Sequence, residues 1–394
     1  MTPGAGPARP DIGVVALVAD VWTPDYWMAR HQIMTRLARA FHVVWLDRPL
    51  GWRAALRPQG LDVPRARTGA ITVPGMPPGF VVLHPGRWLP DVVRPAWLRN
   101  WLGRTRLRYA QRVLRRRGVQ HIVYYLWRPQ FAWALEVPGA RAAVYHVVDD
   151  YSFSAADPPV SPEEARLLRA VDQVIVHSPG LVEKRGRYNP RTALIPNGVD
   201  FAAFSTPQAI PADLAAIPGP RIGYVGFLKK TLDLPLLVDV ARRHPAWSFV
   251  LVGRNHLPPG ADEPLRQLPN VHLLGARRRA ELGAYVQHMD VCILPYVLDG
   301  YTKYIYPLKL HEYLAAGRAV VSTPLRSLLE HRGVVTLAQT ADEWSQALTA
   351  AVASNGDRVA AEGRRAVARA HDWDGLVEKI AALIGDRVAG ESRT

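Results

Sequence analysis

Arg221-Ile-Gly-Tyr-Val-Gly226, in the second half of the chain, is a short apolar run that ends in glycine. It restarts a pattern that Asp11-Ile-Gly-Val-Val-Ala-Leu-Val18 begins in the first half. After each run, segments with helical spacing of apolar residues alternate with further short apolar runs. Because strands that alternate with helices are typical of parallel sheets, the sequence predicts an α/β fold with two Rossmann-like, doubly wound domains.

The length of 394 residues also suggests two domains. We expect helices over residues 27–40, 234–244, 280–287 and 307–316. We expect further strands over residues 41–47, 81–84, 121–126, 142–148, 173–177, 193–196, 248–253, 271–274, 291–295 and 319–322. The predicted division is a disordered tail (1–10), a first domain (11–205), a second domain (206–370) and a C-terminal helix that crosses back to the first domain (371–394).

Composition excludes several classes of protein. The one cysteine, Cys292, lies in an apolar run, which excludes a disulfide framework and a cysteine-rich zinc site. No apolar stretch approaches the ~18 residues of a membrane-spanning helix, and the first residues do not resemble a signal peptide. We therefore expect a cytoplasmic protein. We expect no metal site: His311-Glu312 begins like a zinc-protease motif, but Ala315 stands where the second histidine would be.

The charge is uneven along the chain. The net charge is +15, and residues 1–200 hold 27 basic and 15 acidic side chains. Residues 51–150 alone hold 16 basic and 5 acidic side chains. This excess predicts an anionic partner for the first half of the chain.

The strongest local motif is the segment that leads into the helix expected over residues 307–316. Pro307 suits the first turn of a helix, and Gly317 suits its end. The N-terminus of this helix then points into the crevice at the carboxyl ends of the strands, where its free N–H groups near Leu308 and Lys309 favour a diphosphate. Lys309 adds positive charge, and Glu312, one turn further, is placed to bind a ribose.

These residues belong to a set of stretches in which the sequence resembles nucleotide-sugar-dependent glycosyltransferases of the GT-B fold. The bacterial surface-polysaccharide group, with its teichuronic-acid-type enzymes, is most similar, and the xanthan-type glucuronosyltransferase is more distantly similar. The resemblance rests on the order and spacing of stretches within residues 20–32, 147–152, 195–200, 223–226, 244–253, 268–275 and 307–317. It implies two Rossmann-like domains that face a cleft, and a hexosyltransferase that serves polysaccharide biosynthesis in the cell envelope. We expect the transfer to need no metal, because a lysine and the helix N-terminus already offset the charge of the leaving diphosphate.

The resemblance also implies roles for individual residues in the second domain. The expected donor-binding residues are Gly226, Lys229, Lys230, Arg254, Asn255, Tyr304, Leu308, Lys309 and Glu312. The backbone of residues 275–277 is expected to hold the base of a UDP- or GDP-type donor, which is a substrate, so no cofactor is expected. Many retaining relatives carry a glutamate at the position of Tyr304, and its absence leaves the stereochemistry of the transfer open.

An inverting transfer needs a general base on the acceptor side. Asp149 and Asp150 follow a predicted strand and supply two adjacent carboxylates, of which we expect one to be the base. His31 is the competing candidate. Trp127 and Arg128, after the strand expected over residues 121–126, are expected to contact the acceptor.

Residues 87–117 mix arginine with tryptophan and leucine, a composition that suits the surface of an anionic membrane. An ordinary amphipathic helix with a charged outer face explains it equally well. We expect a glycan or a polyprenyl-diphosphate-linked acceptor, reached by peripheral attachment to the inner face of the cytoplasmic membrane. Two alternatives stay open: a nucleotide-sugar epimerase of the same fold, and a basic nucleic-acid-binding protein, although no nucleic-acid reader motif is present.

Overall fold

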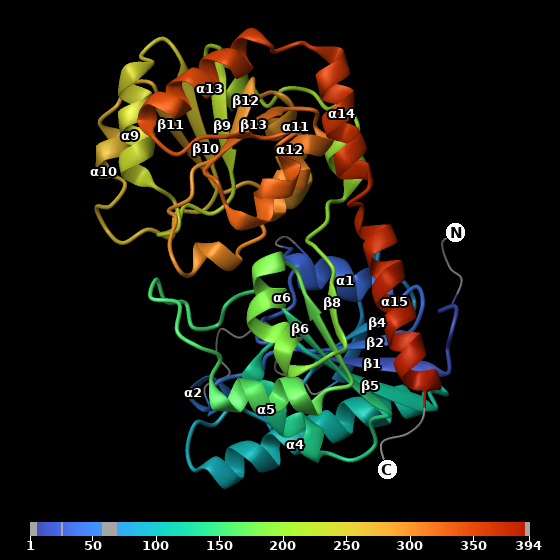
Figure 1. Cartoon of the computed structure of the whole chain (residues 1–394). Helices are drawn as coiled ribbons and strands as arrows, with labels where there is room; N and C mark the ends of the chain where they lie inside the picture. Colours follow the sequence, from blue (N-terminus) through green and yellow to red (C-terminus); the bar gives the residue numbers. More distant parts are fainter. Residues whose placement is uncertain (1–5, 25–26, 57–68, 391–394) are drawn as a thin grey trace.

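The computed structural model describes residues 6–24, 27–56 and 69–390, which form two α/β domains one above the other (Figure 1). The prediction of two doubly wound domains is confirmed. Outside the described residues lie 1–5, which belong to the expected tail, and 57–68, which belong to the basic stretch 51–150.

The first domain contains a sheet in the order β3-β4-β2-β1-β5-β6-β7-β8. All neighbours pair in parallel except β3 and β4, which are antiparallel. The strands are β1 (Ile12–Leu17), β2 (His42–Leu46), β3 (Gly69–Thr72), β4 (Phe80–His84), β5 (His121–Leu126), β6 (Ala142–Val147), β7 (Gln173–Val176) and β8 (Thr192–Leu194). Strands β1, β4 and β6 are buried along their whole length, which explains why they read as continuous apolar runs.

The second domain contains an all-parallel sheet in the order β11-β10-β9-β12-β13-β14. Its strands are β9 (Arg221–Val225), β10 (Ser248–Val252), β11 (Val271–Gly275), β12 (Val291–Leu294), β13 (Ala319–Ser322) and β14 (Thr336–Leu337). The sheet reverses its order between β9 and β12, and open α/β sheets bind ligands at such a switch point.

Helices cover both faces of each sheet. In the first domain, α1 (Ala29–Leu37) and α15 (Trp373–Ala389) pack on one face. The other face carries α4 (Ala96–Arg115), the 3₁₀ helix η1 (Pro129–Glu136), α5 (Pro162–Ala170) and α6 (Pro179–Arg185). In the second domain, one face carries α7 (Phe201–Ser205), α11 (Leu282–Gln287), α12 (Leu308–Ala315) and α14 (Arg358–Arg369). The opposite face carries α9 (Leu234–Arg243), α10 (Glu263–Arg266) and α13 (Ala341–Ala353).

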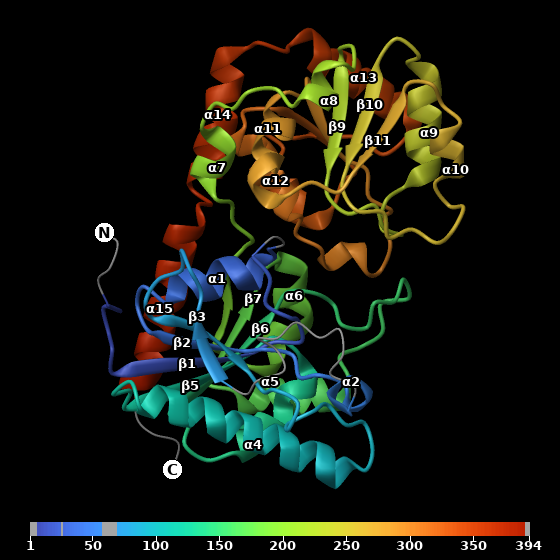
Figure 2. The same ribbon diagram turned by 180° about the vertical axis from the view of Figure 1, so that it is seen from behind.

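The chain crosses between the domains twice, and the two crossings lie side by side. Val199 N–H donates to the His371 carbonyl at 3.0 Å, and Trp373 N–H donates to the Val199 carbonyl at 3.0 Å. After this point α15 packs against α1 in the first domain, as Figure 2 shows from behind. Helix α7, within the range 11–205, packs instead on α11 and α12 of the second domain.

The remaining elements are short. They are α2 (Trp52–Leu56), α8 (Ala212–Ala215), and the 3₁₀ helices η2 (Gly186–Tyr188), η3 (Arg279–Glu281), η4 (Thr302–Tyr304) and η5 (Arg326–His331). None of the helices in the described ranges combines the length and apolarity that a bilayer crossing requires.

Candidate functional site

The carboxyl end of β9 and the N-terminus of α12 meet at the switch point of the second sheet. Tyr313, on α12, binds the last residue of β9: its hydroxyl accepts from the Val225 N–H at 2.8 Å. Gly226 follows with a φ of +151°, a backbone conformation that favours glycine. A Cβ atom there would lie 1.8 Å from Cε of Lys309, so only glycine lets the lysine cross the strand end.

Lys309 and Glu312 lie one turn apart on α12, as the sequence predicts. The Lys309 Nζ lies 5.3 Å from the Tyr224 ring centre. The N-cap residue of α12, Pro307, offers no side-chain hydrogen bond to the N–H groups of the first helical turn. Burial raises the pKa of Glu312 to about 7, while the charges of Lys309 and Arg279 oppose that rise. Glu312 has no hydrogen-bond or ion-pair partner within the described part of the chain, so its carboxyl group is available to a ligand.

Arg279 is a functional candidate that the sequence analysis missed. It extends from η3 to the first domain, where its guanidinium lies 4.0 Å from the ring centre of Trp27. Its Nη2 also pairs with Asp200 at 3.0 Å. Arg279 thus adds a second cation near Glu312 and lies between the two domains. The only signal in the sequence is the run Arg277-Arg278-Arg279, which also suits a solvated surface.

The loops after β9 and β10 contain the other predicted donor residues. Lys229 is half-buried, whereas Lys230 and Arg254 are exposed. Asn255 is engaged within its own loop, because its side chain donates to Asp262 at 3.0 Å and accepts from the Leu257 N–H at 2.9 Å. Asn255 therefore shapes this loop.

The backbone expected to hold the donor base is supported by one arginine. Arg277 donates to the Leu274 carbonyl at 2.6 Å and to the Tyr285 hydroxyl at 2.7 Å. It also pairs with Asp213. These contacts hold residues 275–277 in place at the end of β11.

Asp149 and Asp150, although adjacent, lie in different environments. Asp150 is 2% exposed and pairs with Arg185 at 2.9 Å and with Lys184 at 3.2 Å. Asp149 is half-buried, and its Oδ1 accepts a hydrogen bond from the Tyr301 hydroxyl at 3.0 Å. Since Tyr301 belongs to the second domain, Asp149 lies at the contact between the domains, whereas Asp150 belongs to a buried ionic network.

His31 is buried at the start of α1 among three tryptophan rings. Its ring centre lies 4.7 Å from that of Trp45 and 5.4 Å from that of Trp22. Burial lowers the pKa of His31 to about 3, and the charges of Arg30 and Arg279 add to this effect. A neutral imidazole with so low a pKa is a weak proton acceptor at pH 7.

Trp127 and Arg128, like Asp149 and Asp150, are adjacent in the sequence but lie in different environments. Trp127 is 2% exposed and stacks on His146 at 4.5 Å, so it belongs to the core of the first domain. Arg128 is half-buried, and its guanidinium lies 5.7 Å from the ring centre of Tyr151. Of the two predicted acceptor residues, Arg128 alone is open to a ligand.

Tyr304 lies at the contact between the domains. Its hydroxyl binds both carboxylate oxygens of Asp157, at 2.9 and 2.8 Å, and its ring lies 4.6 Å from the Lys184 Nζ. Burial opposes ionisation of Asp157, but hydrogen bonds from Lys184, Tyr304 and Lys303 lower its pKa to about 2. The hydroxyl group of Tyr304 is therefore hydrogen-bonded to the first domain in this structure.

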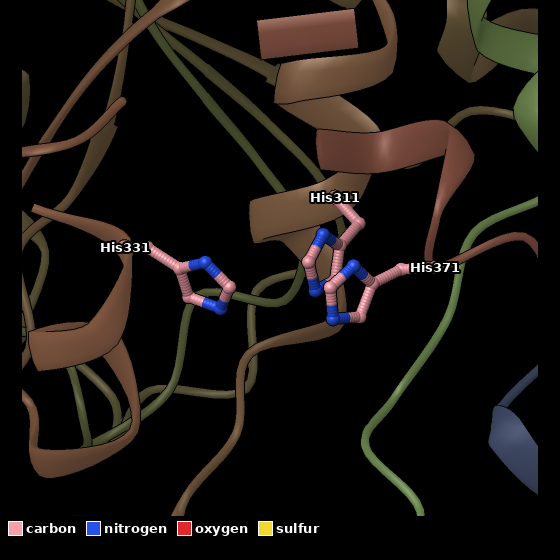
Figure 3. A group of neighbouring side chains, drawn as sticks. All are labelled: His311, His331 and His371. Carbon is pink, nitrogen blue, oxygen red and sulfur yellow. The ribbon is translucent and has the colours of Figure 1, made fainter. Parts of the chain in front are cut away.

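His311 on α12 lies beside His331 and His371, and the ring nitrogens of the three histidines are neighbours (Figure 3). The Tyr306 hydroxyl lies between two of them, 2.8 Å from His311 Nε2 and 3.0 Å from His331 Nε2. His311 and His371 stack face to face at 3.9 Å, a geometry in which their in-plane lone pairs do not converge on one ion. Burial holds the pKa of His311 well below its usual range, so this imidazole is neutral and supports α12 through its hydrogen bond with Tyr306.

With this geometry established, comparison with known proteins identifies the second domain. Residues 219–354 match the family described as Glycosyl transferases group 1. Over these residues the second domain is similar to group 1 glycosyltransferases. A protein of Bacillus subtilis (strain 168), provisionally named teichuronic acid biosynthesis glycosyltransferase TuaH, is 30% identical over 235 residues. That match covers 56% of this chain and spans 59% of the relative's own length.

Solved structures with the same fold cover nearly all of the chain. WaaG, a glycosyltransferase involved in lipopolysaccharide biosynthesis, aligns with a TM-score of 0.59 at 16% identity, over 96% of this chain and all of WaaG. HepE of Anabaena, solved in complex with UDP and glucose, aligns with a TM-score of 0.61 at 15% identity, over 95% of this chain and 99% of HepE. The chain thus has a GT-B fold, and TuaH and WaaG are described as glycosyltransferases rather than as epimerases or nucleic-acid-binding proteins.

Proposed function

We propose that this chain transfers a sugar from a nucleoside-diphosphate sugar of the UDP or GDP type to a glycan or lipid-linked acceptor in polysaccharide biosynthesis. The observation that carries the proposal is the arrangement on α12. Lys309, in the uncapped first turn, lies across Gly226, and Glu312, one turn further, has no hydrogen-bond or ion-pair partner among the described residues. Cations and a helix N-terminus favour a diphosphate, and a carboxylate suits ribose hydroxyls.

The same site supports departure of the nucleoside diphosphate. As the bond from the sugar to the β-phosphate breaks, negative charge grows on the diphosphate oxygens. Lys309 and the N–H groups of α12 are positioned to stabilise this charge, and Arg279 adds a further cation. We therefore expect transfer without a metal ion, so that chelation by EDTA leaves the rate unchanged.

Asp149 is our choice for the general base of an inverting transfer. Asp150 is paired with two cations, whereas Asp149 has one neutral partner, the Tyr301 hydroxyl. Asp149 would take the proton from the acceptor hydroxyl while that oxygen bonds to the anomeric carbon and the diphosphate leaves. Tyr301 would position the carboxylate, and inversion at the anomeric carbon would follow.

Thermal-shift measurements with UDP, GDP, ADP and dTDP test nucleotide binding. One of the four should raise the melting temperature of the wild-type protein, and Glu312→Ala should weaken that nucleotide's binding by roughly 1.5–3 kcal/mol. A folded Glu312→Ala protein with wild-type affinity by calorimetry would remove Glu312 from the site.

We also propose that the first domain docks on an anionic membrane from the cytoplasmic side. Three tryptophans near α4 are strongly exposed: Trp88 at 74%, Trp97 at 70% and Trp101 at 56%. Arginines accompany them, and the Arg87 guanidinium lies 4.6 Å from the Trp88 ring centre. Purified protein should bind anionic vesicles and be released by salt. Equal binding to neutral vesicles would contradict an electrostatic docking face.

A further inference from the structure

A cavity of about 1030 Å³ opens on the first domain, away from α12. Its floor is formed by the residues that follow β1 and β2, and its walls by η1, α4 and α5. This volume is at the upper end of the range typical of ligand sites. Strand β5, which leads into η1, is the neighbour of β6 in the sheet, and Asp149 follows β6. The cavity therefore lies at the same sheet edge as the proposed base.

Most acidic side chains in this cavity already have partners. Asp20 pairs with Arg30, and Glu136 pairs with Arg104. Asp47, buried beneath the floor, binds His84 at 2.9 Å. These carboxylates therefore offer little negative charge to an incoming ligand.

Three arginines of the cavity wall have no carboxylate partner within the described part of the chain. Arg99 extends from α4 and Arg166 from α5, and both are exposed. Arg128 precedes η1, and its guanidinium lies 5.7 Å from the centre of the Tyr151 ring. Asp91 and the buried Arg106 also line the cavity, and the charge of Asp91 acts on this arginine. Glu163 on α5 is the exposed acid that remains, so the opening has a positive excess. Guanidinium groups bind phosphate oxygens with paired hydrogen bonds.

The cavity wall also carries aromatic side chains. Phe131 and Trp133 of η1 line the cavity, and both are half-buried. A ligand with an anionic head and an apolar tail would satisfy both the arginines and these aromatic rings.

We propose that this cavity binds the phosphate groups of a lipid-linked acceptor, with its hydrocarbon chain along the rings of Phe131 and Trp133. The proposal rests on the proposed function and deepens it, because it names the acceptor class and three residues that bind it. The acceptor sugar would then extend from the arginines towards Asp149 at the same sheet edge.

The test measures binding of farnesyl diphosphate in neutral detergent micelles by calorimetry, with the donor site filled by the nucleoside diphosphate that gives the largest thermal shift. The test variant is Arg99→Ala with Arg166→Ala. The matched control is Arg108→Ala with Arg112→Ala, which removes two exposed charges of α4 that do not line the cavity. Melting temperatures verify that both proteins are folded.

We expect the test variant to raise the Kd at least tenfold and the control to change it less than threefold. Inorganic pyrophosphate should compete with farnesyl diphosphate, although more weakly, and farnesol should not bind in the cavity. Equal losses in the two variants, an unchanged Kd in the test variant, or equal binding of farnesol would each overturn the proposal. Failure of all nucleotides to bind, with the arginine dependence intact, would contradict the donor site and leave the cavity assignment standing.

Discussion

Exchange of a carboxylate for an amide should lower turnover at Asp149 but lower stability at the adjacent Asp150. Asp149→Asn keeps the size of the side chain and its contact with Tyr301 but removes a proton acceptor. A positioned general base contributes ~10²–10⁴-fold, which is about 3–5 kcal/mol of the barrier. We therefore expect kcat to fall by that factor while the affinity for the donor and the melting temperature change little.

Asp150→Asn should instead destabilise the first domain. Asp150 is buried against Arg185 and Lys184, and loss of one partner from a buried ion pair costs roughly 3–5 kcal/mol. Arg185 retains Glu164 at 2.8 Å, which favours the lower end of that range. For a domain of this size, about 3 kcal/mol corresponds to roughly 6–12 °C in melting temperature.

The assay combines steady-state turnover with thermal melting of both variants. The reasoning is refuted if Asp149→Asn turns over at the wild-type rate, or if Asp149→Asn melts as early as Asp150→Asn. Tyr301→Phe provides a further check, because a residue that only positions Asp149 should lower kcat less than Asp149→Asn does and leave donor KM unchanged.

Three further predictions follow from the same geometry. Because the pKa of Glu312 is raised to about 7, nucleotide affinity should rise about tenfold between pH 6 and 8 as the carboxylate forms. Calorimetry of the Glu312→Gln variant should show that this rise is lost. Burial lowers the pKa of His31 to about 3 in the folded protein, whereas in the unfolded chain this histidine takes up a proton below about pH 6.5. Acidification from pH 7 to pH 5 therefore favours the unfolded chain, and this residue should cost about 2 kcal/mol of stability. Melting curves of His31→Phe should show a weaker loss between pH 7 and 5, and an identical loss would contradict this account. Tyr304→Phe removes the hydrogen bond to Asp157 between the domains, so the melting temperature should fall while kcat changes less than threefold; a loss of kcat as large as that of Asp149→Asn would place Tyr304 in the chemistry.

The fold was predictable because the strands that define it are buried on both faces and therefore read as continuous apolar runs. Strand β3 was missed for the converse reason: it is an exposed edge strand, and its four residues carry no apolar run. The position of Lys309 and Glu312 was also predictable, because a helix start and a spacing of three residues place both at one site.

The roles of single residues in the first domain depend on partners that are distant in the sequence. Asp149 and Asp150 look alike along the chain, and only the contacts with Tyr301 and Arg185, 152 and 35 residues away, separate them. Arg279 likewise reaches Trp27 from the opposite domain. Such pairings follow from tertiary packing, which local sequence patterns do not encode.

The central claim is sugar transfer from a nucleoside-diphosphate donor at the α12 site. Its most direct test is incubation of the purified protein with labelled nucleotide sugars and a polyprenyl-diphosphate-linked acceptor, followed by proton NMR of the isolated product. We predict release of the nucleoside diphosphate, label in the acceptor, and an anomeric configuration opposite to that of the donor. Release of a new nucleotide sugar without label in any acceptor would contradict the transferase, and a retained configuration would contradict Asp149 as the base.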